Sequence, residues 1–238
     1  MIAAISMLLV YLTLGFIVGL LGIPWTLIRR DVTWLYNSAL WVVRTGLRAG
    51  GIRVEVTGLE NVPVDRCCIF MANHVSNLDP PVLLPVLPSR TSVLLKKELM
   101  SIPLLGIAMR LAQFIPVERG NQREKAMESI RAAAEVLRSG VPITIFPEGT
   151  RSRDGRLSEF KKGPFFLAME TGAPIVPIAI HGTESMMRKG SMKVFPGVAH
   201  VDFLPAIYPS AYQTREQLTQ AVRESILAAL PPQMRPSA

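Results

Sequence analysis

The sequence predicts an α/β domain with a central mixed sheet flanked by helices, preceded by an N-terminal membrane-associated helical segment. Three observations carry this expectation. The first 28 residues contain no charged side chain. From residue 52 onward, short apolar runs alternate with helical patterns, which is typical of an α/β domain. The chain has 238 residues, enough for one large domain and a small appendage. We therefore expect membrane-anchoring helices over residues 1–50 and the α/β domain over residues 51–238.

The uncharged N-terminal segment is long enough to cross a bilayer. As a helix, its 28 residues would extend about 42 Å, against a hydrocarbon core of roughly 30 Å. A cleaved signal peptide fits less well, because no basic region precedes the apolar stretch and no small-residue cleavage site follows it. Gly22 and Pro24 weaken its far end as a straight helix. Arg29 and Arg30 come next, so the positive-inside rule predicts an inner or cytoplasmic membrane with the catalytic domain facing the cytoplasm.

A second helix is expected over residues 34–48. Wound at about 100° per residue, this segment gathers Arg30, Asn37, Arg44 and Arg48 into one stripe, with Trp and aliphatic residues over much of the rest. Such a helix can lie at a membrane surface, or it can be an ordinary amphipathic helix that faces the core. The two helices could also form a hairpin that dips into one leaflet. The sequence leaves spanning and dipping open.

Composition favours a lipid partner over nucleic acid. The formal net charge of +8 predicts anionic partners, and 49% of the residues are hydrophobic. No run of arginines interleaved with aromatic residues marks a nucleic-acid surface. The two cysteines, Cys67 and Cys68, are adjacent and predict neither a disulfide framework nor a zinc site. His74, His181 and His200 also lack the spacing of metal ligands, so no metal is expected.

The domain is expected to alternate strands and helices from Gly50-Gly51 onward. The clearest helix covers residues 121–138, where Asn121 and Glu124 form a capping box and Gly140 follows the end. Further helices are expected over residues 102–111 and 214–230. The expected strands cover residues 52–56, 67–71, 92–95, 114–117, 143–146, 175–180 and 198–204.

A histidine and an aspartate follow one of these strands in the motif Asn73-His74-x4-Asp79. On a helix this spacing would place the two side chains roughly 140° apart, but at a strand–turn–helix corner they can converge. A carboxylate that holds a histidine fixes its tautomer and stabilises the imidazolium, as a general base requires. The alternative is that Asp79, which precedes a proline, only caps a helix and that His74 is a chance loop residue.

A second candidate motif, Phe146-Pro147-Glu148-Gly149-Thr150-Arg151-Ser152, follows another predicted strand. Gly149 permits a positive-φ turn that can expose backbone N–H groups to an anion or a developing oxyanion. Arg151 adds a planar charge suited to phosphate. The alternative is a solvated basic loop. Phe114 to Arg119 likewise ends a strand in an arginine, where a surface salt bridge of Glu118 is the alternative.

Four blocks follow one another in the sequence: Asn73-His74-x4-Asp79, Phe114 to Arg119, Phe146-Pro147-Glu148-Gly149-Thr150-Arg151 and Ala173-Pro174-Ile175-Val176-Pro177. Together they resemble the glycerolipid acyltransferase family, most closely its 1-acyl-sn-glycerol-3-phosphate acyltransferase branch. The resemblance covers roughly residues 50–210, and the first and third blocks are jointly very specific. The Lys96-Lys97-Glu98-Leu99 stretch is also similar to this branch. One departure is Ala112-Gln113, where the family commonly has a glycine.

The resemblance implies the reaction and the partners. A fatty acyl group would pass from an acyl thioester, acyl-CoA or acyl carrier protein, to the sn-2 hydroxyl of 1-acyl-sn-glycerol-3-phosphate (lysophosphatidic acid), giving phosphatidic acid for phospholipid biosynthesis at a membrane. His74 matches the general base and Asp79 its orienting carboxylate. The thioester is a co-substrate, and no cofactor is implied. The residues that match substrate binding are Lys97, Arg119, Glu148, Gly149, Thr150 and Arg151.

Three alternatives to this reaction stay open. The same chemistry could act on another lysolipid or on a glycerol-phosphate-like acceptor. A non-catalytic membrane lipid-binding protein is a second alternative, against which the intact His74 and Asp79 argue. A hydrolase is the third, but the chain has no Gly-x-Ser-x-Gly elbow. Acyl-chain length, donor identity, the oxyanion donors and the oligomeric state cannot be predicted from these residues.

Overall fold

The computed structural model of the chain describes residues 2–118, 123–152, 154–188 and 190–236. Within these ranges, seven strands form one sheet in the order β1-β7-β6-β2-β5-β3-β4. Hydrogen-bonded neighbours are parallel except β6 and β7, so the sheet is mixed, as predicted. The strands are β1 (Ile52–Thr57), β2 (Ile69–Ala72), β3 (Ser92–Lys96), β4 (Ile115–Val117), β5 (Ile143–Ile145), β6 (Ile175–His181) and β7 (Gly197–Phe203).

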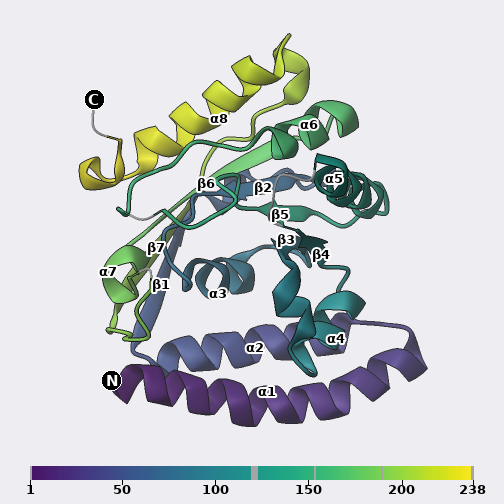
Figure 1. The fold of residues 1–238 in the computed structure, drawn as a ribbon, viewed down its shortest axis with the longest axis vertical. Helices are drawn as coiled ribbons and strands as arrows, with labels where there is room; N and C mark the ends of the chain where they lie inside the picture. Colours follow the sequence, from purple (N-terminus) through teal and green to yellow (C-terminus); the bar gives the residue numbers. More distant parts are fainter. Residues whose placement is uncertain (1, 119–122, 153, 189, 237–238) are drawn as a thin grey trace.

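Helices cover both faces of the sheet (Figure 1). One face carries α5, α6 and α8, and the other carries α3 with α1 and α2 beneath it. Strands β2 and β5 are therefore buried on both faces, which explains why they appear in the sequence as short continuous apolar runs. The helices are α1 (Ile2–Arg29), α2 (Thr33–Ala49), α3 (Asp79–Leu83), α4 (Leu105–Leu111), α5 (Arg123–Arg138), α6 (Lys162–Thr171), α7 (Thr183–Met186) and α8 (Arg215–Ala229).

The helices differ from the sequence-based expectations in three places: α4, α6 and α7, the last of which was not predicted. α6 was not predicted, because it follows a basic stretch and contains Gly163-Pro164, both of which suggest a loop. α4 begins only at Leu105, after the 3₁₀ turn η3 (Lys97–Ser101). α1 contains Pro24 and continues as a helix to Arg29. The predicted cap at Asn121 lies outside the described residues, whereas Gln113 takes φ +63 where the family commonly has a glycine.

The two N-terminal helices lie side by side below the domain (Figure 1). Glycines permit their close approach: a Cβ at Gly46 would lie 2.0 Å from a ring carbon of Tyr11, and one at Gly22 would lie 2.7 Å from Leu35. α2 also packs on the domain along its length. The Tyr36 hydroxyl accepts a hydrogen bond from the Thr91 backbone N–H at 3.2 Å, and near the other end of α2 Leu47 is buried in the core below the sheet.

Asn73 joins the ends of two central strands at the edge where the candidate motifs lie. Its side-chain amide donates to the carbonyl oxygen of Ile180 at 2.8 Å and accepts from the backbone N–H of Ile180 at 2.7 Å. The side chain thus substitutes for a peptide group between β2 and β6 and satisfies two backbone groups that are buried from water. This fixes the point at which the chain leaves β2 and turns into His74.

Candidate active site

Three loops meet at the carboxyl edge of the parallel strands. The loop after β2 carries His74 and leads into α3, and the loop after β5 carries Phe146 to Ser152. The third connection is the single residue Gly182, which joins the end of β6 to α7. Because β2 pairs with both β5 and β6 in parallel, these three ends lie at the same edge of the sheet. Ligand sites of open α/β sheets usually lie at this edge.

The structure brings His74 and Asp79 together. The His74 Nδ1 atom lies 2.8 Å from the Asp79 Oδ2 atom. Because an ionised carboxylate oxygen can only accept, the tautomer that forms this hydrogen bond carries its proton on Nδ1 and donates it to Asp79. This leaves the Nε2 atom with its lone pair. The imidazole packs against the Phe146 ring with centroids 4.4 Å apart, and 13% of the His74 side chain is exposed. The ring is therefore held from one side and remains accessible.

The carboxylate of Asp79 is fully buried and has several hydrogen-bond donors. Oδ2 accepts from the backbone N–H groups of Val75 at 2.7 Å and Ser76 at 2.8 Å. Oδ1 accepts from the Thr183 hydroxyl at 2.6 Å. The alternative interpretation, in which Asp79 only caps a helix, is wrong: α3 begins at Asp79 itself, and its carboxylate turns back toward the preceding loop instead of capping the first turn. Its donors compensate for burying an ionised carboxylate.

Glu148 lies beneath the histidine and is only 2% exposed. Its Oε1 atom accepts from the backbone N–H of His74 at 2.6 Å, and Oε2 accepts from the backbone N–H of Ser158 at 2.9 Å. Burial raises the pKa of Glu148 above its ordinary value, and the two N–H donors oppose that shift. Both carboxylate oxygens are thus engaged by the chain itself, and the residue anchors the backbone on which His74 sits.

The loop after β5 has the predicted glycine turn but a different N–H arrangement. Gly149 takes φ +71, as expected. Its N–H, however, bonds to the Phe146 carbonyl oxygen at 2.9 Å, so that group closes the turn instead of facing an anion. The backbone N–H of Ser152 bonds to the His74 carbonyl oxygen at 2.9 Å. Arg151 and exposed Thr150 therefore lie in a loop that is attached directly to the histidine.

The remaining predicted binding residues are placed elsewhere or not described. Lys97 is exposed at the start of η3 and forms an ion pair with Glu118 after β4, a carboxylate that also pairs with Lys125 at 2.5 Å. Hydrogen bonds from Lys125 and then Lys97 lower the pKa of Glu118 to about 2. The surface salt bridge of Glu118, which was the alternative interpretation of this stretch, therefore exists. Arg119, the other predicted residue, lies outside the described residues.

Sequence reasoning missed the contribution of the segment after β6. Thr183 begins α7 and bonds to Asp79, and the carbonyl oxygen of Met187 accepts the Ser76 hydroxyl at 2.8 Å. The available signal was Gly182-Thr183 directly after a buried strand, since such positions reach the carboxyl edge. Among the described residues, no three His, Cys, Asp or Glu side chains gather into a set that could hold a metal.

Comparison with known proteins decides the family. A family model described as Acyltransferase matches residues 53–181, which include both candidate motifs. The chain belongs to the acyltransferase family. The resemblance predicted from the four blocks is therefore confirmed.

Relatives of this acyltransferase agree with the match. It is 32% identical to a 1-acyl-sn-glycerol-3-phosphate acyltransferase of Borreliella burgdorferi over 79% of the chain and 76% of that protein. It is 35% identical to a chloroplastic one of Brassica napus over 70% of the chain, which corresponds to about half (47%) of that longer protein. The crystal structure of the 1-acyl-sn-glycerophosphate acyltransferase of Thermotoga maritima matches with a TM-score of 0.74 at 29% identity, covering 94% of both chains.

Replacing Asp79 by Asn tests the histidine–carboxylate pair. The amide keeps the size of the carboxylate but removes the charge that stabilises the imidazolium, so we expect kcat for acyl transfer to fall by about 10²-fold or more. Asp65→Asn is the matched control, because Asp65 is an exposed carboxylate that pairs with its sequence neighbour Arg66. The measurement is kcat of purified protein in detergent, with thermal unfolding followed in parallel. A folded Asp79→Asn enzyme with the control's kcat would contradict the pairing.

Proposed function

We propose that this acyltransferase moves a fatty acyl group from an acyl thioester to the sn-2 hydroxyl of 1-acyl-sn-glycerol-3-phosphate, giving phosphatidic acid. The observation that carries the proposal is the buried Asp79 carboxylate that fixes His74 with Nε2 available, in a loop attached to Arg151. The names of the relatives support the same acceptor, since each describes an enzyme that acts on 1-acyl-sn-glycerol-3-phosphate or 1-acyl-sn-glycerophosphate.

The chemistry requires a general base and no nucleophile from the protein. His74 Nε2 takes the proton of the acceptor hydroxyl while the oxygen attacks the thioester carbonyl carbon, forming a C–O bond. The tetrahedral intermediate then collapses, the C–S bond breaks, and the thiolate leaves with the proton returned by the imidazolium. Asp79 holds the tautomer and stabilises the imidazolium throughout. A positioned base of this kind contributes about 10²- to 10⁴-fold in rate.

Arg151 is the side chain that we assign to the acceptor phosphate. Its neighbour Ser152 bonds to the backbone of His74, so a phosphate held by Arg151 would keep the substrate hydroxyl near Nε2. A guanidinium can hold a phosphate through two parallel hydrogen bonds, which a lysine cannot. Arg119 follows β4 in the sequence and is assigned to the same phosphate by the resemblance alone. Glu148 acts differently, by fixing the backbone of His74 rather than by touching substrate.

The thioester donor is acyl-CoA or acyl carrier protein. Both are anionic, and the formal net charge of +8 suits either. Comparing the two donors at equal acyl chain length in the acyltransfer assay distinguishes them, because a carrier-protein donor adds a protein interface that the nucleotide lacks.

We further propose that α1 and α2 lie along one leaflet instead of crossing the bilayer. α1 is long and apolar enough to span a membrane by length and composition. It lies beside α2, however, and α2 packs on the domain from Tyr36 to Leu47. If α1 crossed the bilayer, α2 and the part of the domain that contacts α2 would therefore have to enter the hydrocarbon core as well. Exposed Arg29, Arg30 and Asp31 lie where α1 ends and the chain turns into α2. Charged side chains are costly in the hydrocarbon core, which also disfavours insertion of this turn into the bilayer.

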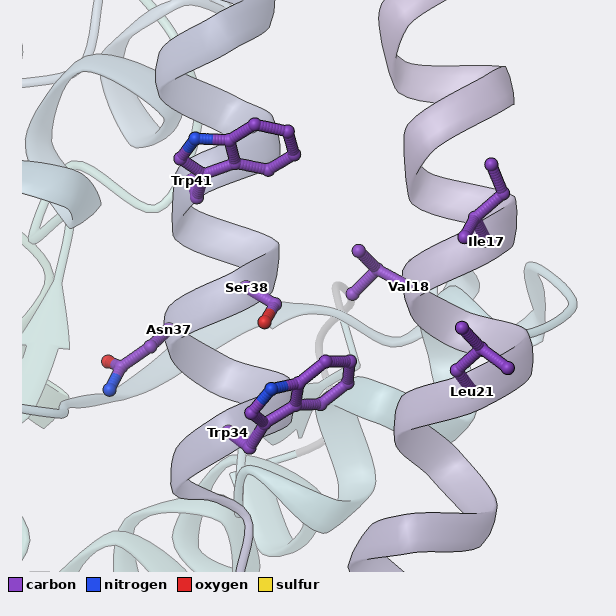
Figure 2. Close-up of a pocket in the computed structure, with 7 residues that line it drawn as sticks. All are labelled: Ile17, Val18, Leu21, Trp34, Asn37, Ser38 and Trp41. Carbon is purple, nitrogen blue, oxygen red and sulfur yellow. The ribbon is translucent and has the colours of Figure 1, made fainter.

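The surface between these helices fits a place among lipid chains. A groove of about 410 Å³ runs between α1 and α2, and none of the residues that line it belongs to the candidate active site. Figure 2 shows Trp34 and Trp41 projecting from α2 toward α1, with Ser38 between them. Tryptophan is enriched where a protein meets the headgroup level of a membrane. The groove is lined by Ile17, Val18, Leu21, Trp34, Asn37, Ser38 and Trp41.

The reaction is tested with purified protein, a panel of lysolipids and both thioester donors. We expect the fastest acyl transfer to 1-acyl-sn-glycerol-3-phosphate. His74→Ala should cut kcat by about 10²-fold or more, because the base is removed while the fold is kept. His200→Ala is the control, since His200 lies on β7 beside Glu55 of β1 and His181 of β6 and takes no part in the His74–Asp79 pair. Faster turnover of a lysolipid without a phosphate monoester would replace the proposed acceptor, and an active His74→Ala enzyme would refute the mechanism.

Arg151→Lys tests the phosphate assignment. Lysine keeps the charge but loses the planar fork, so KM for the lysophospholipid should rise while KM for the thioester changes little. Arg151→Ala should cost more, on the order of 2–5 kcal/mol if the pair is desolvated in the complex. Arg131→Lys on the exposed face of α5 is the control. Varying each substrate separately decides the point: a rise confined to the thioester KM would move Arg151 to the donor side.

The membrane placement predicts which side of the membrane each terminus occupies. Helices that lie in one leaflet keep the N-terminal and C-terminal ends on the same side, whereas a single span separates them. Tags at the two ends, probed by protease in sealed vesicles, should therefore be digested together, and carbonate washing should leave the protein on the membrane. Protection of the N-terminal tag alone would show that α1 crosses the bilayer. Release by carbonate would contradict insertion altogether.

A further inference from the structure

We infer that Thr183 is a positioning residue of the catalytic pair, one that acts on His74 through the carboxylate of Asp79. The residue follows the last strand of the matched acyltransferase range, which ends at residue 181, so the family match does not include it. The inference rests on the proposed function, because it assigns a part in the same general-base step.

The hydrogen bonds of Asp79 are divided unequally between its two oxygens. Oδ2 takes the two backbone N–H groups of the preceding loop and the proton on His74 Nδ1. For Oδ1, the hydrogen bond that the structure gives is from the Thr183 hydroxyl, at 2.6 Å. Both Asp79 and Thr183 are completely buried, so water cannot replace that donor.

This division gives the hydroxyl an orienting role. The χ2 torsion of an aspartate is broad and nearly two-fold, so packing alone sets the carboxylate plane only loosely. The Thr183 hydroxyl fixes Oδ1, and the plane then presents Oδ2 to the imidazole. Errors in such geometry are costly, because a displacement of about 1 Å can cost on the order of 10²-fold in rate.

The backbone after β6 is shaped to bring Thr183 to this place. Gly182 takes φ +91, and a Cβ there would lie 2.4 Å from the carbonyl oxygen of Val198, so a side chain is excluded on both counts. The short helix α7 then begins at Thr183, and one residue after its end the Met187 carbonyl oxygen accepts the Ser76 hydroxyl. The loop that carries the catalytic pair is thus held by this segment at two points.

The test compares three substitutions at Thr183 with one at another buried threonine. Thr183→Val keeps the shape and removes the hydroxyl, Thr183→Ser keeps the hydroxyl, and Thr183→Ala removes it with the methyl. Thr144→Val is the matched control, because the Thr144 hydroxyl is equally buried but bonds to Thr91 on the neighbouring chain segment. Unfolding is followed for each variant, so that kcat refers to folded protein.

We expect kcat to fall on the order of 10- to 100-fold in Thr183→Val, with both KM values nearly unchanged, and to recover largely in Thr183→Ser. Thr144→Val should keep the wild-type kcat. The inference is overturned if folded Thr183→Val keeps the wild-type kcat, if kcat falls equally in Thr183→Ser and Thr183→Val, or if kcat falls as much in Thr144→Val. Should the valine variant not fold, the ratio of kcat between the serine and alanine variants decides the same question.

A second readout separates this inference from the proposed function. In ¹⁵N-histidine-labelled protein, the Nδ1 proton of His74, assigned by its loss in His74→Ala, reports the bond to Asp79 without any substrate. We expect this resonance to shift or broaden in Thr183→Val and to return in Thr183→Ser. An unchanged resonance refutes the positioning role even if the enzyme is active. A wild-type protein inactive on every acceptor refutes the proposed reaction, whatever the resonance does.

Discussion

The site depends on one buried negative charge. An ionised carboxylate without compensating donors would be strongly destabilising in a protein interior. Asp79 meets this constraint with two backbone N–H groups, the imidazole of His74 and the hydroxyl of Thr183. Because these donors come from two segments that follow neighbouring strands, the charge can be buried only when β2 and β6 are correctly aligned. Asp79 therefore serves two ends: it orients His74 for proton transfer, and its burial depends on the correct alignment of the two strands.

A second buried carboxylate stabilises the same corner from the other side. Glu148 binds the backbone N–H of His74 and so connects the loop after β5 to the loop after β2. Burial raises the pKa of Glu148, because removal from water disfavours the ionised carboxylate relative to the protonated one. Asp79 controls the His74 ring and Glu148 controls the His74 backbone. The two carboxylates have the same chemistry but different tasks, and geometry alone separates them.

The N-terminal helices suit this site to a lipid substrate. α2 is attached to the domain near both of its ends, and α1 lies on α2 through contacts that glycines make possible. The apolar outer face of α1 is therefore fixed relative to the sheet instead of hanging on a flexible linker. Helices that lie in one leaflet would hold the domain at the membrane, where an acceptor with one acyl chain resides.

Local patterns in the sequence determined the family, the mixed α/β sheet, the two N-terminal helices and the pairing of His74 with Asp79, because short apolar runs, glycine turns and fixed spacings are encoded locally. Tertiary structure decided what depends on contacts distant in the chain. It turned the Asp79 carboxylate away from a helix cap and placed Glu148 under the histidine, and it brought Thr183 to Oδ1 across 104 positions of sequence. The physical reason is that a buried polar atom bonds to whichever donor the packed strands deliver, and the order of strands in the sheet does not follow their order in the sequence.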